Sequence, residues 1–195
     1  QGIIGQEIRM IEDRPGWQAY HRLLEALYEH HPVRNSVAGS VESIAQIPAE
    51  TLYHCHEAFY TPSNMVLCVA GNVDPEQVCA MAREILPKEA KPAIPRDHGS
   101  NEPSQVYCQE DVLTMEVAAP LLQIGVKLQA AHDGPAQLRQ RLLGDLACDS
   151  LGGSFSPLYN KLYAEGLING SFYMGYVDYP GCAFLMAGGE SKDPT

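Results

Sequence analysis

Apolar residues in the first 60 positions recur at spacings of three and four, which is the period of an α-helix. One such run predicts a helix over residues 1–11, and Pro15 separates it from a second helix. The second run ends before Pro32, because proline cannot continue a helix. A third run starts with Pro48 in its first turn and predicts a helix over residues 48–60.

A short apolar run in the middle of the chain has a different character. Residues 65–70 are apolar throughout and end at Gly71, which predicts a buried β-strand. Asp74 then precedes Pro75, which is the arrangement of an N-cap and the first position of a helix. This part of the chain is therefore predicted as a strand followed by a helix.

Beyond residue 103 the pattern predicts strands first, then helices, then a hairpin. An apolar stripe at Leu138, Leu142 and Leu146 marks the first of these helices. This order of elements favours an α+β fold over a doubly wound sheet. The predicted ranges are strands over 104–111, 112–120 and 121–131, helices over 134–150 and 151–167, and two strands around a Pro-Gly turn within 168–190.

A proline-rich stretch divides the chain. It holds several prolines within a few residues and no apolar periodicity. We therefore predict a linker over residues 93–103, between a first part, 1–92, and a second part, 104–195.

Charge and composition argue against two classes of binding partner, nucleic acids and membranes. The formal net charge of −11 comes without clusters of Lys and Arg, which nucleic acid phosphates demand, so no nucleic acid partner is expected. No apolar run approaches the roughly 18 residues needed to cross a bilayer, so no membrane partner is expected either. The hydrophobic fraction of 45% is that of an ordinary globular protein.

The cysteines are widely scattered and form neither a Cys-x-x-Cys pair nor a compact disulfide framework. This pattern predicts buried free thiols in a reducing compartment, and hence a cytoplasmic location. The six residues are Cys55, Cys68, Cys79, Cys108, Cys148 and Cys182.

Motifs that are complete within the chain do not specify an enzyme. His30 and His31 are neighbours, and His54 and His56 stand two apart, so neither pair shares one face of a helix. The His-x-x-x-His spacing of a helical zinc site is absent, as are the nucleophile elbow, the P-loop and the dinucleotide fingerprint. On spacing alone, Glu7 is an ordinary solvated acid on a helix.

Four stretches taken together resemble a known family. They are QGIIGQEIRMIEDRPGW, HHPVRNSVAGSVESI, FYTPSNMVLCVAGNVDPEQV and SLGGSFSPLYNKLYAEGLINGSF. In this order they resemble the zinc metallopeptidases of the pitrilysin, insulinase and mitochondrial processing peptidase family, in particular its bacterial members built from two halves. The resemblance extends through almost the whole chain.

The resemblance implies a fold and a domain division. The fold would be α+β, with two layers: an antiparallel-rich sheet and helices packed on one of its faces. Residues 1–92 would be the C-terminal part of the first, zinc-bearing half, and residues 104–195 the N-terminal part of the second half.

The resemblance also implies site residues. Members carry an inverted His-x-x-Glu-His motif, in which the histidines bind zinc and the Glu activates water, and a Glu on a later helix is the third ligand. Glu7 matches that third ligand. The family's Arg and Tyr that contact substrate correspond to Tyr163 and Asn169, so this pair is not preserved.

His-x-x-Glu-His does not occur in this chain, which we therefore expect to be a fragment, inactive and without bound zinc on its own. The parent protein is then expected to be a zinc-dependent endopeptidase that cleaves peptides between its two halves. The alternative is a non-catalytic member that serves as a subunit or peptide-binding partner. A self-contained binding domain is the third reading.

Two expectations concern assembly. A fragment that cuts across two domains would leave apolar faces uncovered, and such faces favour self-association of the isolated chain. A dimer of the parent with a paralogue is the second expectation.

Overall fold

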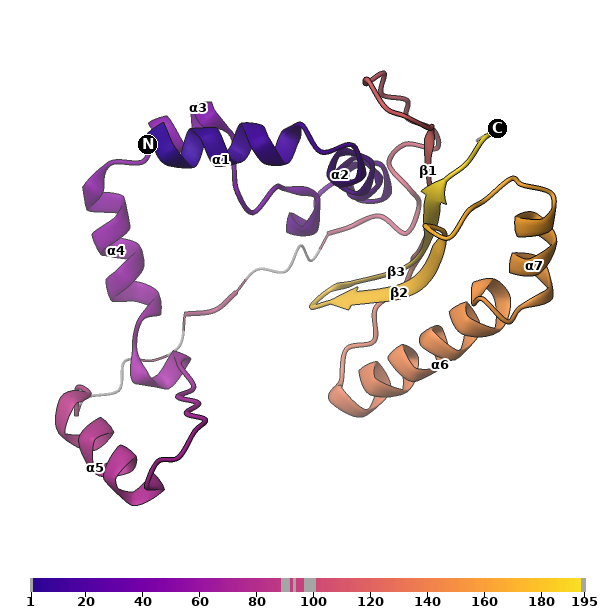
Figure 1. Cartoon of the computed structure of the whole chain (residues 1–195). Helices are drawn as coiled ribbons and strands as arrows, with labels where there is room; N and C mark the ends of the chain where they lie inside the picture. Colours follow the sequence, from indigo (N-terminus) through magenta and orange to yellow (C-terminus); the bar gives the residue numbers. More distant parts are fainter. Residues whose placement is uncertain (1, 89–91, 93, 97–100, 194–195) are drawn as a thin grey trace. The chain divides into compact units, whose positions relative to one another are not determined.

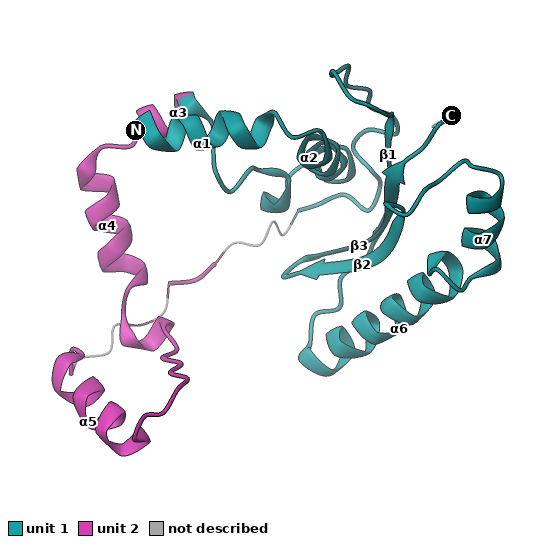
Figure 2. Ribbon diagram, in the orientation of Figure 1, with its two compact units in different colours: residues 1–41, 97–195 teal, residues 42–96 magenta. Residues whose placement is uncertain are grey.

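The computed structural model describes residues 2–88, 92, 94–96 and 101–193 (Figure 1). The chain forms two compact units, unit 1 with residues 1–41 and 97–195, and unit 2 with residues 42–96 (Figure 2). In chain order the elements are α1 (Gly2–Glu12), α2 (Pro15–Leu27), η1 (Pro32–Arg34), α3 (Val41–Ala45), α4 (Ala49–Phe59), η2 (Pro62–Asn64), α5 (Pro75–Ile85), β1 (Leu121–Leu128), α6 (Gly134–Gly152), α7 (Pro157–Ala164), β2 (Tyr173–Tyr179) and β3 (Cys182–Glu190).

The helices begin where local signals place them. The Asp74 carboxylate accepts hydrogen bonds from the backbone N–H groups of Glu76 and Gln77, which confirms the predicted N-cap of α5. Asp133 caps α6 and Ser156 caps α7 in the same way. No helix in the described part of the chain is long and apolar enough to span a membrane.

The three strands form an antiparallel sheet in unit 1 with the order β1-β3-β2. The predicted hairpin is present, and Gly181 with φ of 87° makes its turn between β2 and β3. Met186 of β3 pairs with Gly125 of β1 and Gly175 of β2, so these three residues share one face of the sheet. Their chain neighbours point to the opposite face.

Helix α2 covers the first face and forms the core of unit 1. Leu24, Leu27 and Tyr28 pack against Phe184 and its neighbours on β3, and Phe184 is fully buried. The Tyr28 hydroxyl donates a hydrogen bond to the Ala183 carbonyl oxygen at 3.0 Å. Gly125 allows the close approach, because a Cβ atom there would lie 2.8 Å from a methyl carbon of the α2 residue Leu23.

Helix α6 covers the second face of the sheet over β2. Gly144 of α6 packs on Tyr176, where a Cβ atom would come within 2.5 Å of the ring. The predicted stripe of Leu138, Leu142 and Leu146 is instead more than half exposed, because the glycine side of α6 and the buried Cys148 approach the sheet. The α6 helix is therefore confirmed, while its apolar stripe does not form the contact with the sheet.

The α+β class with an antiparallel sheet is confirmed. One detail differs from the prediction, which placed the helices on one face of the sheet. The register places α2 and α6 on opposite faces of the sheet (Figure 1).

Three predicted strands are wrong. Residues 65–70 form no ladder and are exposed, and residues 104–111 and 112–120 also lack strand structure. A strand is stable only when a neighbour satisfies its backbone groups, and no described residue of unit 2 offers a ladder to 65–70. The Cys108 N–H donates instead to the Ala26 carbonyl at the end of α2.

The compact units divide the chain differently from the predicted parts 1–92 and 104–195, which remain a prediction about the family's halves. Of the predicted linker 93–103, residues 93 and 97–100 lie outside the described residues.

All six cysteines are free, as predicted. The prediction that they are buried is right for Cys148 and Cys182 of unit 1 and wrong for the other four. Three of those four, Cys55, Cys68 and Cys79, lie in unit 2, where Thr61 is the one buried residue among those described. The described residues of unit 2 therefore form no core in which a thiol could be buried.

Candidate functional site

Glu7 lies in the middle of α1 and is exposed. The buried residues of this helix are Gly5 and Ile8, which lie away from the Glu7 side. The Glu7 side carries apolar neighbours at helical spacing, Ile3 with 82% and Met10 with 53% of its surface exposed. The carboxylate therefore stands in an exposed apolar strip rather than on a charged, solvated face.

The described residues do not fit a zinc site on their own. A catalytic zinc takes three protein ligands and a water, and a carboxylate oxygen is an acceptable ligand. Across the part of the chain that the structure describes, no group of three His, Cys, Asp or Glu side chains gathers around Glu7 or elsewhere. A zinc site that included Glu7 would need its other protein ligands from outside the described residues.

Tyr163 lies in the last turn of α7 and is exposed. Its ring stacks on Tyr159 one turn earlier, with ring centroids 5.9 Å apart. The hydroxyl end of an exposed tyrosine is able to donate to a ligand. The structure therefore leaves Tyr163 available for binding, and its predicted contact with substrate stays a prediction.

Asn169 precedes β2 and has local partners on both ends of its amide. Its Nδ2 donates to the Glu190 carboxylate at 2.7 Å, and its Oδ1 accepts from the Ser171 N–H at 2.8 Å. The Ser171 hydroxyl in turn accepts from the Glu190 N–H at 2.9 Å. These bonds tie the start of β2 to the end of β3, so Asn169 has a structural role in addition to any contact with substrate.

The histidine clusters have structural partners. His31 is buried; its Nδ1 accepts from the Val33 N–H, which leaves Nε2 as the donor to the Pro180 carbonyl at 3.0 Å. His56 stacks on Tyr60 with ring centroids 4.8 Å apart. These contacts give His31 and His56 structural roles.

The buried titratable groups of the core are poor acids and bases. Burial, with Tyr179 nearby, raises the pKa of Tyr20 to about 12, and burial also raises the pKa of Tyr28. Burial likewise raises the pKa of the Cys148 and Cys182 thiols, so both remain protonated and unreactive at neutral pH. None of these four groups is a candidate for nucleophile or general base.

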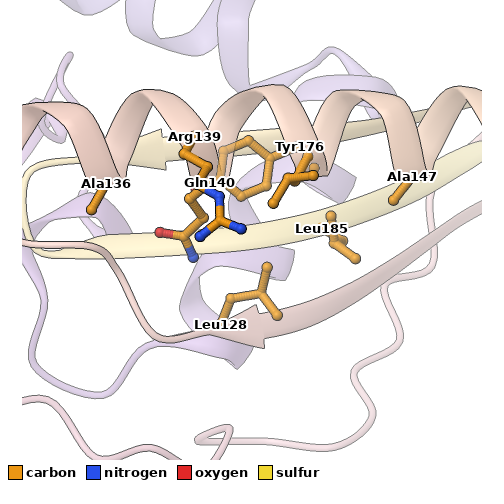
Figure 3. A pocket seen from close by; sticks show the side chains of 9 residues that line it. Leu128, Ala136, Arg139, Gln140, Ala147, Tyr176 and Leu185 are labelled. Carbon is orange, nitrogen blue, oxygen red and sulfur yellow. The ribbon is translucent and has the colours of Figure 1, made fainter.

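A groove of about 380 Å³ runs between α6 and the second face of the sheet (Figure 3). Its polar lining includes the Arg139 guanidinium and the Gln140 amide, and that amide already bonds Gln129 and Ala131. The Tyr176 hydroxyl is buried without a hydrogen-bond partner among the described residues. Its apolar lining comes from Leu128, Ala136, Leu143, Ala147 and Leu185, together with the Tyr176 ring.

A buried ion pair joins Glu102 to Lys127, and no motif in the sequence predicts it. Glu102 falls within the predicted linker, and Lys127 falls within the apolar strand β1. A lysine inside an apolar strand is a signal of a buried partner, because an unpaired charge is costly to bury. No sequence pattern pointed to Glu102 as that partner.

Comparison with known proteins agrees with the fold. The family description "Peptidase M16 inactive domain" matches residues 46–193, which leaves Glu7 outside the matched range. The Bacillus subtilis protein YmfH, described as an uncharacterized zinc protease, is 37% identical over 198 residues, which cover 100% of this chain and 46% of that relative.

Two solved structures share the fold. An M16-like peptidase from Alicyclobacillus acidocaldarius has a TM-score of 0.86 and 34% identity, over 99% of this chain and 46% of that one. Pitrilysin has a TM-score of 0.64 with 15% identity, over 97% of this chain and 21% of its own, and supports the fold alone.

The chain spans about half the length of YmfH and of the Alicyclobacillus peptidase. The family match covers most of its length, and the order of its elements is that of M16 peptidase structures. The resemblance found in the sequence is thereby confirmed, and this chain belongs to the M16 family of peptidases.

Proposed function

We propose that this chain is part of a zinc-dependent endopeptidase, in which Glu7 is the third zinc ligand and peptides are cleaved between two α+β halves. The whole protein, rather than this chain alone, would be the active species. The remaining ligands and the group that activates water would come from sequence outside this chain. In this proposal α7 and the start of β2 contribute Tyr163 and Asn169 to the substrate side.

The observation that carries the proposal is the position of Glu7. Its exposed apolar neighbours, Ile3 and Met10, are unfavourable in water and indicate that further protein covers this side of α1. A carboxylate buried among apolar residues needs a cation or hydrogen bonds to remain ionised. A zinc ion is the partner that membership of a family with zinc proteases suggests.

The test uses the whole protein that contains this chain. Zinc content and cleavage of a fluorogenic peptide are measured for wild type, Glu7→Gln and, as a control acid at the end of the same helix, Glu12→Gln. Glu7→Gln is expected to lose zinc and on the order of 100-fold or more of the activity, because a ligand change costs at least as much as a change in its supporting residues. Unchanged zinc and activity in Glu7→Gln would remove Glu7 from the site.

A second candidate is a non-catalytic subunit or peptide-binding partner. The observation that favours it is Asn169, whose amide is committed to Glu190 and Ser171, at a position where active members are expected to contact substrate. The sequence that precedes Gln1 in the whole protein discriminates the two candidates. An intact His-x-x-Glu-His motif there supports the peptidase, and a degraded motif supports the subunit.

A further inference from the structure

We propose that Glu102 is a positioning residue, whose carboxylate fastens the C-terminal end of α2 to the sheet of unit 1. Its effect on catalysis rests on the proposed function, since α2 follows directly on α1, the helix that carries Glu7. The fastening itself is a property of the described contacts.

The carboxylate of Glu102 is held by three successive backbone N–H groups. Glu29 donates to one oxygen at 2.9 Å, and His30 and His31 donate to the other at 2.7 Å each. Successive N–H groups that converge in this way form an anion-binding concavity. Here a side chain 71 to 73 residues away in the sequence occupies it, so the chain just beyond α2 is tied to residue 102.

Lys127 ties the same carboxylate to the sheet. Its ammonium lies 2.5 Å from Glu102 and also donates to the Gln105 carbonyl at 3.0 Å. Only 6% of the Lys127 side chain and 9% of the Glu102 side chain are exposed. The ammonium lies 4.7 Å from the centroid of the Tyr28 ring, so the pair also packs on the core residue at the end of α2.

The segment that follows Glu102 runs along α2 and adds weaker ties. Arg22 of α2 binds the Asp111 carboxylate with two hydrogen bonds, at 2.6 and 2.9 Å. The Cys108 N–H donates to the Ala26 carbonyl at 2.9 Å. Arg22 and Asp111 are each about a third exposed, so solvent screens this pair far more than the Glu102 pair.

The fastened helix transmits its position to α1 through a short, well-bonded junction. Gln18 of α2 donates its side-chain amide to the Glu12 carbonyl at the end of α1, at 2.8 Å. The Arg14 N–H donates to the Ile11 carbonyl at 3.1 Å across the same junction. A shift of α2 relative to the sheet would therefore displace α1 and with it Glu7.

Amide hydrogen exchange in the whole protein tests the fastening without reference to activity. Glu102→Gln is compared with wild type and with Glu110→Gln, which removes an exposed acid in the same segment. Loss of bonds to an ionised acceptor is expected to raise exchange at residues 29–31 by roughly 10- to 100-fold, with α6 still protected and Glu110→Gln unchanged. Exchange at 29–31 that stays at the wild-type rate would overturn the proposal.

Glu102→Asp provides the milder change, since it keeps the charge and shortens the reach. If Glu102→Gln also loses protection in α6, the exchange rates of Glu102→Asp decide. Faster exchange confined to residues 29–31 in that variant supports the fastening, and faster exchange throughout the unit contradicts it.

Peptide kinetics test the consequence for the site. Glu102→Gln is expected to lower kcat by about tenfold with a smaller change in KM, because a displaced ligand affects the chemical step more than binding. Partial rescue in Glu102→Asp is expected. Faster exchange with unchanged kcat would refute the positioning role, and a wild-type protein that cleaves no peptide would refute the proposed function while the exchange result stands.

Discussion

The two units of this chain differ in what holds them together. Unit 1 has a three-stranded sheet with α2 on one face and α6 on the other, and its central residue Phe184 is fully buried. Unit 2 has the helices α4 and α5, of 11 residues each, yet its apolar residues are exposed, as at Val66 with 94%. Unit 1 is stabilised by the burial of apolar side chains between its elements. Unit 2 is stabilised mainly by local interactions within each helix.

The difference in burial between the two units indicates which surfaces we expect further protein to cover. An isolated helix of 11 residues such as α4 or α5 is marginal in water, because most helix stability in proteins comes from burial of an apolar face. In the proposed function, further protein would cover both the exposed apolar residues of unit 2 and the Glu7 side of α1.

The largest expected effect is a loss of stability from the core of unit 1. Phe184→Ala is expected to reduce the free energy of unfolding by about 3–5 kcal/mol, because it opens a cavity under α2. Val66→Ala in unit 2 is the matched change and is expected to cost less than about 0.5 kcal/mol in this chain. Denaturant unfolding of the two variants measures both values; equal losses would break the comparison.

The buried ion pair provides the next effect within unit 1. Lys127→Met leaves the Glu102 carboxylate buried without its cation and is expected to cost about 3–5 kcal/mol. Asp111→Asn breaks the more exposed pair with Arg22 and is expected to cost about 1 kcal/mol or less. Chemical unfolding measures both, and a reversed order would show that the buried pair contributes little.

The same pair predicts a dependence on pH. Burial opposes ionisation of Glu102, but the hydrogen bonds from Lys127 and three backbone N–H groups outweigh it and lower the pKa from 4.5 to about 2. A depressed pKa contributes stability that is fully present above pH 4.5 and lost as the pH falls towards 2, on the order of 3 kcal/mol. The acid branch of the stability profile measures this loss, and Glu102→Gln should flatten that branch.

The smallest expected effect concerns a single helix of unit 2. Asp74→Ala removes the N-cap of α5 and is expected to cost about 1 kcal/mol in that helix. The unfolding of unit 1 should be unchanged, since α5 belongs to unit 2. Amide exchange within residues 75–85 reports on the helix, while a parallel change in β3 would show that the units are coupled.

Elements that depend on local signals could be predicted from the sequence. Asp74 and Pro75 locate the start of α5 because the cap and the fixed proline φ act within one turn. The run 65–70 has the composition of a strand but lacks a neighbour to pair with, and composition cannot show whether that neighbour is present. Likewise, the exposed Leu138 stripe follows from the close approach of Gly144 to Tyr176, which is a long-range contact.

The same limit applies to the candidate site, where contacts between distant residues could not be predicted from the sequence. The family resemblance predicts Glu7 as a zinc ligand, which stays a prediction, and the structure adds its exposed apolar surroundings. Tyr163 and Asn169 were predicted in the same way and stay predictions, while the bonds of Asn169 to Glu190 and Ser171 could not be foreseen from spacing. Glu102 carries no motif, because its role arises from three N–H groups that only the folded chain brings together.

The measurement that tests the account most directly is the location of zinc in crystals of the whole protein, by anomalous scattering at the zinc edge. The account predicts a peak about 2.0–2.2 Å from a carboxylate oxygen of Glu7, the usual zinc–oxygen distance. A zinc peak remote from Glu7, or no peak in zinc-saturated crystals, would contradict it.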